Sequence, residues 1–129
     1  MEALRRVLAG DPRIAYALLF GSGARESLHP ASDFDVAVGL RPGVSLGTLD
    51  IGALVSDLEQ AAGRAVDLVI LDEAPPAVAY RVFRDGVTLV ERDHQAMADR
   101  RAWAILEYLD FRPLEELAIR GALAAAARG

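Results

Sequence analysis

The sequence predicts an α/β (α+β) fold, in which a small mixed β-sheet is flanked by helices. Apolar runs of strand length alternate with segments of helical periodicity, which is the pattern of a sheet covered by helices. The chain has 129 residues, the size of one domain, and 53% of them are hydrophobic while 26% are charged. We therefore expect residues 1–129 to form a single domain with a core of its own.

The first half of the chain contains the patterns of three strands and two helices. Leu4, Val7 and Leu8 lie at helical spacing and predict a short first helix that ends at Gly10-Asp11-Pro12. The continuous apolar run Ile14–Phe20 predicts a buried strand. The other elements predicted here are a helical turn around Ala24–Leu28, a strand over Asp33–Val38, a helix over Leu49–Ala61 that ends at Gly63, and a strand over Ala65–Leu71.

The second half adds one strand and more helices. The predicted elements are a helix over Ala77–Asp85, a strand over Gly86–Asp93 and a C-terminal helix pair divided at Pro113. Trp103, Leu106 and Leu109 form an apolar stripe on the first helix of that pair. We expect this stripe to belong to the core, the alternative being that part of it contacts a partner protein.

The residue inventory excludes several kinds of chemistry. The absence of cysteine excludes disulfides and thiolate sites, and two histidines, His29 and His94, are too few for a zinc site made of protein ligands alone. The net charge of −5 argues against direct binding of nucleic acid. No apolar stretch has the length of a membrane span and the N-terminus lacks the apolar core of a signal peptide, so we expect a cytoplasmic protein with no membrane contact.

Three acidic residues occur in segments that otherwise have the pattern of buried strands. Asp33 and Asp35 are two residues apart in a strand, so both carboxylates project from one face. Asp67 is the one acid within the apolar run of the third strand. Unpaired buried carboxylates are costly, so a positive group is expected beside them. If the two strands are neighbours, the three carboxylates form an oxygen ligand set suited to Mg²⁺, with room for two ions.

The Gly21-Ser22-Gly23 turn supplies a second half to such a site. It follows an apolar strand and leads into a helical turn, whose free backbone N–H groups favour an anion. A triphosphate would fit there, and Arg25 is placed to add a charge-assisted contact to a phosphate.

Each of these motifs also has a purely structural interpretation. Asp33 and Asp35 could face solvent at a sheet edge, with Asp67 bonded to a backbone amide. The glycine turn could be a simple strand-to-helix connection capped by Ser22, and Arg25 a solvated residue. The combination of all three motifs favours a metal and nucleotide site.

The same residues resemble the signature of the DNA polymerase beta-like nucleotidyltransferase superfamily. Gly21-Ser22 are followed, after ten residues, by Asp33-x-Asp35 and later by an acid on its own strand. Together with the segment ERDHQAMADRRAWAILEYLDFRPLEEL, the stretch FGSGARES…SDFDVAV is similar to the minimal nucleotidyltransferases, specifically the antitoxins of HEPN/MNT toxin–antitoxin pairs. The resemblance extends from Ile14 to about Leu117.

This resemblance implies a polymerase beta-like fold, a set of residue roles and a function. Gly21 and Ser22 would bind the triphosphate of ATP, and Asp33 and Asp35 would ligate the magnesium ions. Asp67 matches the third carboxylate, which ligates the catalytic metal and can assist deprotonation of the acceptor. Members of this group transfer AMP from ATP to a tyrosine of the cognate HEPN toxin, a ribonuclease, and thereby silence it.

Two other functions are compatible with the sequence. An antitoxin could neutralise its partner by contact alone, without chemistry. A small-molecule nucleotidyltransferase of the aminoglycoside-modifying kind would share the motif, but the short chain leaves little room for its substrate-binding residues.

Overall fold

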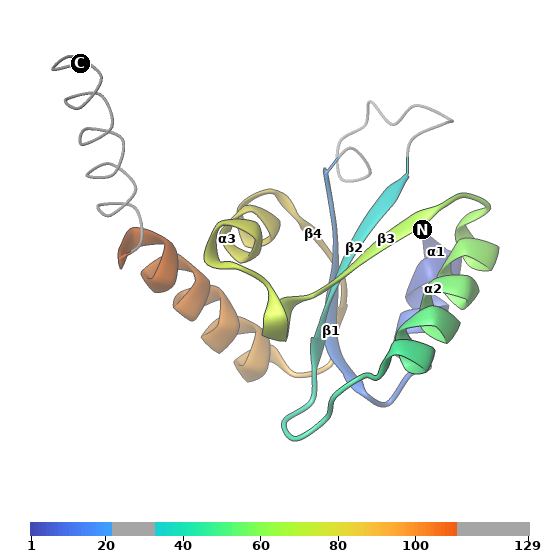
Figure 1. Ribbon diagram of the computed structural model, residues 1–129, viewed down its shortest axis with the longest axis horizontal. Helices are drawn as coiled ribbons and strands as arrows, with labels where there is room; N and C mark the ends of the chain where they lie inside the picture. The colour runs from blue at the N-terminus through green and yellow to red at the C-terminus, as the bar shows by residue number, and fades with distance from the viewer. Residues whose placement is uncertain (22–32, 111–129) are drawn as a thin grey trace, which may run out of the picture.

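The computed structural model describes residues 1–21 and 33–110, and it contains a four-stranded sheet between two layers of helices (Figure 1). The strand order is β3-β2-β1-β4. β1 pairs antiparallel with both β2 and β4, whereas β2 pairs parallel with β3. The sheet is therefore mixed, which confirms the predicted fold class. The strands are β1 Ile14–Phe20, β2 Phe34–Leu40, β3 Val66–Ile70 and β4 Val87–Glu91.

The helices divide between the two faces of the sheet. The first and second helices, α1 Glu2–Ala9 and α2 Thr48–Ala62, lie on one face (Figure 1). The third helix, α3 Pro76–Asp85, and a helix over residues 94–110 cover the other face. A short 3-10 helix, η2 Leu71–Glu73, follows β3. Among the described helices, none is both long and apolar enough to cross a membrane.

The ends of these elements follow the local signals of the sequence. The carboxylate of Asp50 accepts a hydrogen bond from the backbone N–H of Gly47 at the start of α2, at 3.0 Å. The same helix ends at Gly63, whose φ of 69° is the left-handed conformation that glycine adopts without strain. Pro76 occupies the first turn of α3, where its missing N–H is not needed. β2 begins at Phe34, so Asp33 lies one residue before the strand that the sequence assigned to it.

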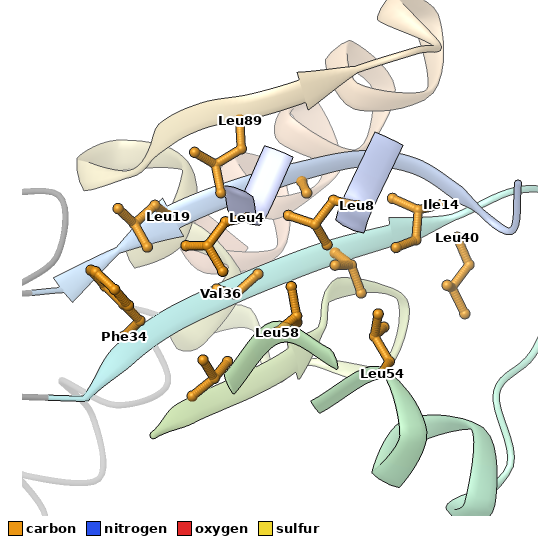
Figure 2. Packing of buried hydrophobic residues seen from close by; sticks show 13 residues of the cluster. Leu4, Leu8, Ile14, Leu19, Phe34, Val36, Leu40, Leu54, Leu58 and Leu89 are labelled. Carbon is orange, nitrogen blue, oxygen red and sulfur yellow. The ribbon is translucent and has the colours of Figure 1, made fainter. Parts of the chain in front are cut away.

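Two apolar clusters hold the layers together, one on each side of the sheet. On the α1 and α2 side, side chains of both helices interdigitate with alternate residues of the strands (Figure 2). The members that are fully buried there are Leu8, Ile14, Ala17, Leu19, Val36, Val38 and Leu58. On the other side, α3 and helix 94–110 contribute Ala79, Val82, Phe83, Met97 and Ala104. Since β1 and β2 supply both clusters, they are the centre of the fold.

A tyrosine ring fills the space above a glycine in the middle of the sheet. Tyr16 of β1 pairs with Gly39 of β2, and a Cβ at position 39 would overlap the Tyr16 ring. Burial and, to a smaller extent, the nearby Asp72 raise the pKa of Tyr16 to about 12, while Arg100 acts in the opposite direction. The sheet therefore needs a residue without a side chain at position 39.

Helix 94–110 is anchored to the sheet by one arginine. Arg100 donates to the backbone oxygen of Leu71 through Nε and Nη2, at 3.2 and 3.1 Å, and to Glu107 at 3.2 Å. Tyr108 stacks on Tyr80 of α3, with ring centroids 4.2 Å apart. The helix is thus fixed at both the end of β3 and the side of α3.

The apolar stripe of this helix does not belong to the core, and the expectation from the sequence was wrong. Trp103, Leu106 and Leu109 are 62%, 53% and 50% exposed. Met97 and Ala104, seven residues apart, turn inward instead and are buried. The small Ala104 side chain allows the helix to approach the sheet closely, which leaves the larger residues outside. The second helix of the predicted pair lies outside the described residues.

We predict that Gly39→Ala destabilises the protein by about 1–3 kcal/mol, because the new methyl group must displace the buried Tyr16 ring. Gly52→Ala in α2 is the matched control, since a Cβ there meets no atom within 4 Å. That change should stabilise the protein by about 0.5–1 kcal/mol, because alanine is the better helix former. Urea unfolding measures both free energies, and equal effects of the two substitutions would contradict this account of Gly39.

Candidate active site

Three of the predicted site residues, Gly21, Asp35 and Asp67, lie where β1 ends and where β2 and β3 begin. In the strand register, Asp35 lies opposite Phe20 of β1 on one side and opposite Asp67 of β3 on the other. β2 and β3 are neighbours, as convergence of their carboxylates requires. Because β2 and β3 are parallel, Asp35 and Asp67 lie directly opposite each other, near the start of both strands.

Both carboxylates also project from the same face of the sheet. Alternate residues of β2, including Val36, pack on the α1 and α2 side, so Asp35 projects to the opposite side. In β3, Leu68 packs on the α1 and α2 side, so Asp67 projects away from it as well. The two acids therefore share the face of the sheet that α3 and helix 94–110 cover.

Two hydrogen bonds hold the start of β3, one from β2 and one to α2. The N–H of Phe34 donates to the backbone oxygen of Ala65 at 3.0 Å. The N–H of Val66 donates to Oε2 of Glu59, on the last turns of α2, also at 3.0 Å. The bond from Phe34 belongs to the register that places Asp67 opposite Asp35, and the bond to Glu59 ties the start of β3 to α2. The sequence analysis did not single out Glu59 as a residue that holds the start of β3. The one signal for this role was its position four residues before Gly63, near the end of the predicted helix.

Gly21 lies directly against the Asp35 carboxylate. Its φ is 66°, a left-handed conformation, and a Cβ at this position would overlap Oδ2 of Asp35. A side chain there would therefore push the carboxylate away from its place. Gly21 thus allows the Asp35 carboxylate to lie against the backbone at the end of β1. Ser22 and Arg25, the other two predicted nucleotide-binding residues, lie outside the described residues.

The carboxylates repel one another where they meet. Partial burial raises the pKa of Asp35, and the negative charges of Asp67 and Asp33 raise it further. Asp33 and Asp67 themselves are exposed. Because the folded protein holds the proton of Asp35 more tightly than the unfolded chain does, the fold loses stability as the pH rises through this pKa.

The donor set fits a hard divalent cation in its chemistry. All three side chains offer carboxylate oxygens, the ligands that Mg²⁺ prefers, and no nitrogen or sulfur ligand lies among them. Within residues 1–21 and 33–110, no three acidic or histidine side chains stand close enough together to hold an ion as they are placed. Repulsion between their negative charges keeps the three carboxylates apart, and a bound cation would draw them together.

The family of the chain follows from a comparison with family models. The model of the polymerase beta nucleotidyltransferase domain matches residues 2–95, which include β1, β2 and β3 with Gly21, Asp35 and Asp67. The chain belongs to this family. Among curated proteins, none matches it.

Solved structures share the fold of this family member over nearly its whole length. A chain from a toxin–antitoxin structure with AMP-PNP has a TM-score of 0.81 at 23% identity, covering 95% of this chain and 97% of that one. A chain from the complex of tri-AMPylated Shewanella oneidensis HEPN toxin with MNT antitoxin has a TM-score of 0.74 at 22% identity, covering 95% and 99%. A candidate minimal nucleotidyltransferase is 31% identical, with a TM-score of 0.55, covering 67% and 89%.

We predict that Asp67→Asn lowers the pKa of Asp35, because the substitution removes one of the charges that oppose its ionisation. The carboxyl ¹³C shift of Asp35, followed by NMR through an acid titration, measures this change. The same variant should be more stable than the wild type at neutral pH, and the gain should vanish in acid once both forms are protonated. Asp57→Asn, at an exposed acid of α2, is the control and should leave the Asp35 titration unchanged.

Proposed function

We propose that this protein is a minimal nucleotidyltransferase that transfers AMP from ATP to a hydroxyl group, and that it acts as an antitoxin by modifying a tyrosine of a HEPN-domain toxin. The observation that carries the proposal is the Asp35–Asp67 pair beside the side-chain-free Gly21, at the strand ends of a polymerase beta family domain. A transferase of this kind needs these carboxylates for its metal.

Asp33, Asp35 and Asp67 are the residues that would hold Mg²⁺. When bound, the cation would neutralise the phosphates and stabilise the charge that develops on them during transfer. The exposed Asp33 and Asp67 and the half-buried Asp35 leave one side of the cluster open to a substrate. The repulsion among the three carboxylates disfavours their close approach without a cation, so cation binding and assembly of the cluster are coupled.

Gly21, Ser22 and Arg25 form the proposed phosphate-binding part. Gly21 has no side chain of its own that would keep a phosphate away from the backbone. Ser22 and Arg25 follow in the sequence and supply a hydroxyl and a guanidinium group to the same anion.

The proposed reaction balances with ATP and a hydroxyl acceptor alone. The acceptor oxygen forms a bond to the α-phosphorus of ATP, and the bond from that phosphorus to the bridging oxygen of the β-phosphate breaks. Pyrophosphate leaves, and the acceptor proton passes to a base, for which Asp67 is the candidate. The products are the AMP ester of the acceptor and pyrophosphate.

Two likenesses support a protein acceptor. One solved structure with this fold is a toxin–antitoxin structure with AMP-PNP, an analogue of ATP, and another contains a tri-AMPylated HEPN toxin with an MNT antitoxin.

We predict that the double variant Asp33→Asn, Asp35→Asn transfers AMP at least about 100-fold more slowly than the wild type, because it loses two carboxylates of the proposed metal site. The assay combines the protein, ATP labelled at the α-phosphate, Mg²⁺ and a HEPN-domain toxin as the acceptor. Label on the HEPN protein, lost on addition of EDTA, is the readout. Asp57→Asn serves as the control and should transfer AMP at the wild-type rate.

The same double variant distinguishes catalysis from neutralisation by contact. Under the proposed function the variant still binds the HEPN protein but no longer protects cells from it. Full protection by a variant that transfers no AMP would show that chemistry is not the mechanism.

A further inference from the structure

The connection between α2 and β3 is short and leads directly to Asp67. α2 ends at Ala62 and β3 begins at Val66, so only residues 63–65 join them. Asp67 is the second residue of β3 and lies opposite Asp35 in the register. A shift of β3 by one residue would turn Asp67 to the other face of the sheet. The place of this carboxylate therefore depends on how the connection is held.

Glu59 holds both ends of this connection. Its backbone oxygen accepts a hydrogen bond from the N–H of Gly63 at 2.9 Å, where the helix ends. Its side-chain Oε2 accepts a hydrogen bond from the N–H of Val66 at 3.0 Å, where the strand begins. Leu58, the preceding residue, is fully buried in the cluster that joins α2 to the sheet. The backbone that carries Glu59 is therefore fixed.

The bond from Val66 is made at the open side of β3. In the described part of the chain, β3 lies at the edge of the sheet, with a neighbouring strand on one side only. Phe34 of β2, the partner of Val66 in the register, donates to the backbone oxygen of Ala65. A backbone N–H at a sheet edge is left to water unless a side chain reaches it. Glu59 supplies that acceptor, and a carboxylate makes a stronger bond than a neutral group does.

A second contact holds the same connection from β2. The guanidinium carbon of Arg64 lies 4.8 Å from the centre of the Phe34 ring, which is a cation–π contact. Phe34 is buried in the cluster on the α1 and α2 side of the sheet. Asp67 projects from the opposite face, so Arg64 supports the connection from behind the candidate site.

These ties oppose a repulsion at the same place. Asp35 and Asp67 are directly opposite each other in adjacent strands, and like charges so placed are destabilising. A start of β3 that moved away from β2 would relieve the repulsion and separate the two carboxylates. A Mg²⁺ ion needs its ligand oxygens at about 2.0–2.1 Å, so such a movement would weaken its binding.

We propose that Glu59 is a positioning residue for Asp67, and that the affinity of the carboxylate site for a divalent cation depends on the hydrogen bond between Glu59 and Val66. This inference rests on the proposed function, in which Asp67 is one of the residues that would hold Mg²⁺. Glu59 acts through the backbone of β3, because its bond fixes Val66 and Asp67 is the next residue. Residues that hold a metal ligand in place commonly affect metal affinity as well.

Two substitutions separate the hydrogen bond of Glu59 from its charge. Glu59→Gln removes the charge but keeps an oxygen that can reach the N–H of Val66. Glu59→Asp keeps the charge, but its side chain is shorter by a methylene group and does not reach. Gln60→Asn, at the next and exposed position, is the control for the same shortening. Exchange of the Val66 amide hydrogen, followed by NMR, should become faster in Glu59→Asp and keep its wild-type rate in the other two variants.

Mn²⁺ is the probe for the affinity of the site, because it broadens the NMR resonances of nearby amides as it binds. We expect wild-type affinity for Mn²⁺ in Glu59→Gln and Gln60→Asn, and about tenfold weaker affinity in Glu59→Asp. Equal affinities of Glu59→Gln and Glu59→Asp would overturn the proposal, because the two variants differ in whether the hydrogen bond to Val66 is kept.

The Mg²⁺ dependence of AMP transfer distinguishes a positioning residue from a ligand. In Glu59→Asp, the Mg²⁺ concentration for half-maximal transfer should rise about tenfold, while the rate at saturating Mg²⁺ stays at the wild-type value. In Asp67→Asn, saturating Mg²⁺ should not restore the rate, because a carboxylate is missing. A Glu59→Asp variant whose maximal rate falls at an unchanged Mg²⁺ requirement would contradict the proposal.

The outcomes separate this inference from the proposed function. A wild-type protein that binds no Mn²⁺ would remove the metal site of the proposed function, and this inference with it. A wild-type protein that binds Mn²⁺ and transfers AMP, together with full Mn²⁺ affinity in Glu59→Asp, would remove the role of Glu59 and leave the proposed function intact.

Discussion

The pairing of Asp35 with Asp67 across β2 and β3 is the interaction on which the candidate site depends. Two carboxylates directly opposite each other in a sheet repel, and partial burial of Asp35 adds to this cost, as its raised pKa indicates. Nothing in the packing of the core needs the pair. The fold is therefore locally less stable at the place where a cation would be bound. Binding sites commonly lower the stability of a protein in this way.

The rest of the molecule holds that pair in position. β1 is hydrogen-bonded on both sides, and apolar clusters cover both faces of the sheet, so the strand ends have little freedom to move. Glu59 fixes the start of β3, and Gly21 brings the end of β1 against Asp35. The face from which Asp35 projects also supports helix 94–110.

Most of the fold could be predicted from the sequence because its signals are local. Gly63 ends α2 and Pro76 begins α3 where the turn chemistry indicates, and the apolar run Ile14–Phe20 is the central strand. The register of Asp35 with Asp67 could not be predicted, since a shift of one residue would turn Asp67 to the other face and no local pattern sets it. The prediction for helix 94–110 was wrong because large apolar residues such as Trp103 were expected to face the core. The residue that faces the core is the small Ala104.

The packing of Tyr16 over Gly39 also limits how this sheet can diverge. The ring occupies the volume that any larger residue at position 39 would need, and the two residues are partners in adjacent strands. A replacement at one position therefore requires a compensating replacement at the other, a small residue in exchange for a large one. Among related sequences these two positions should vary as a couple, so that an alignment would record a contact between strands that no single sequence reveals.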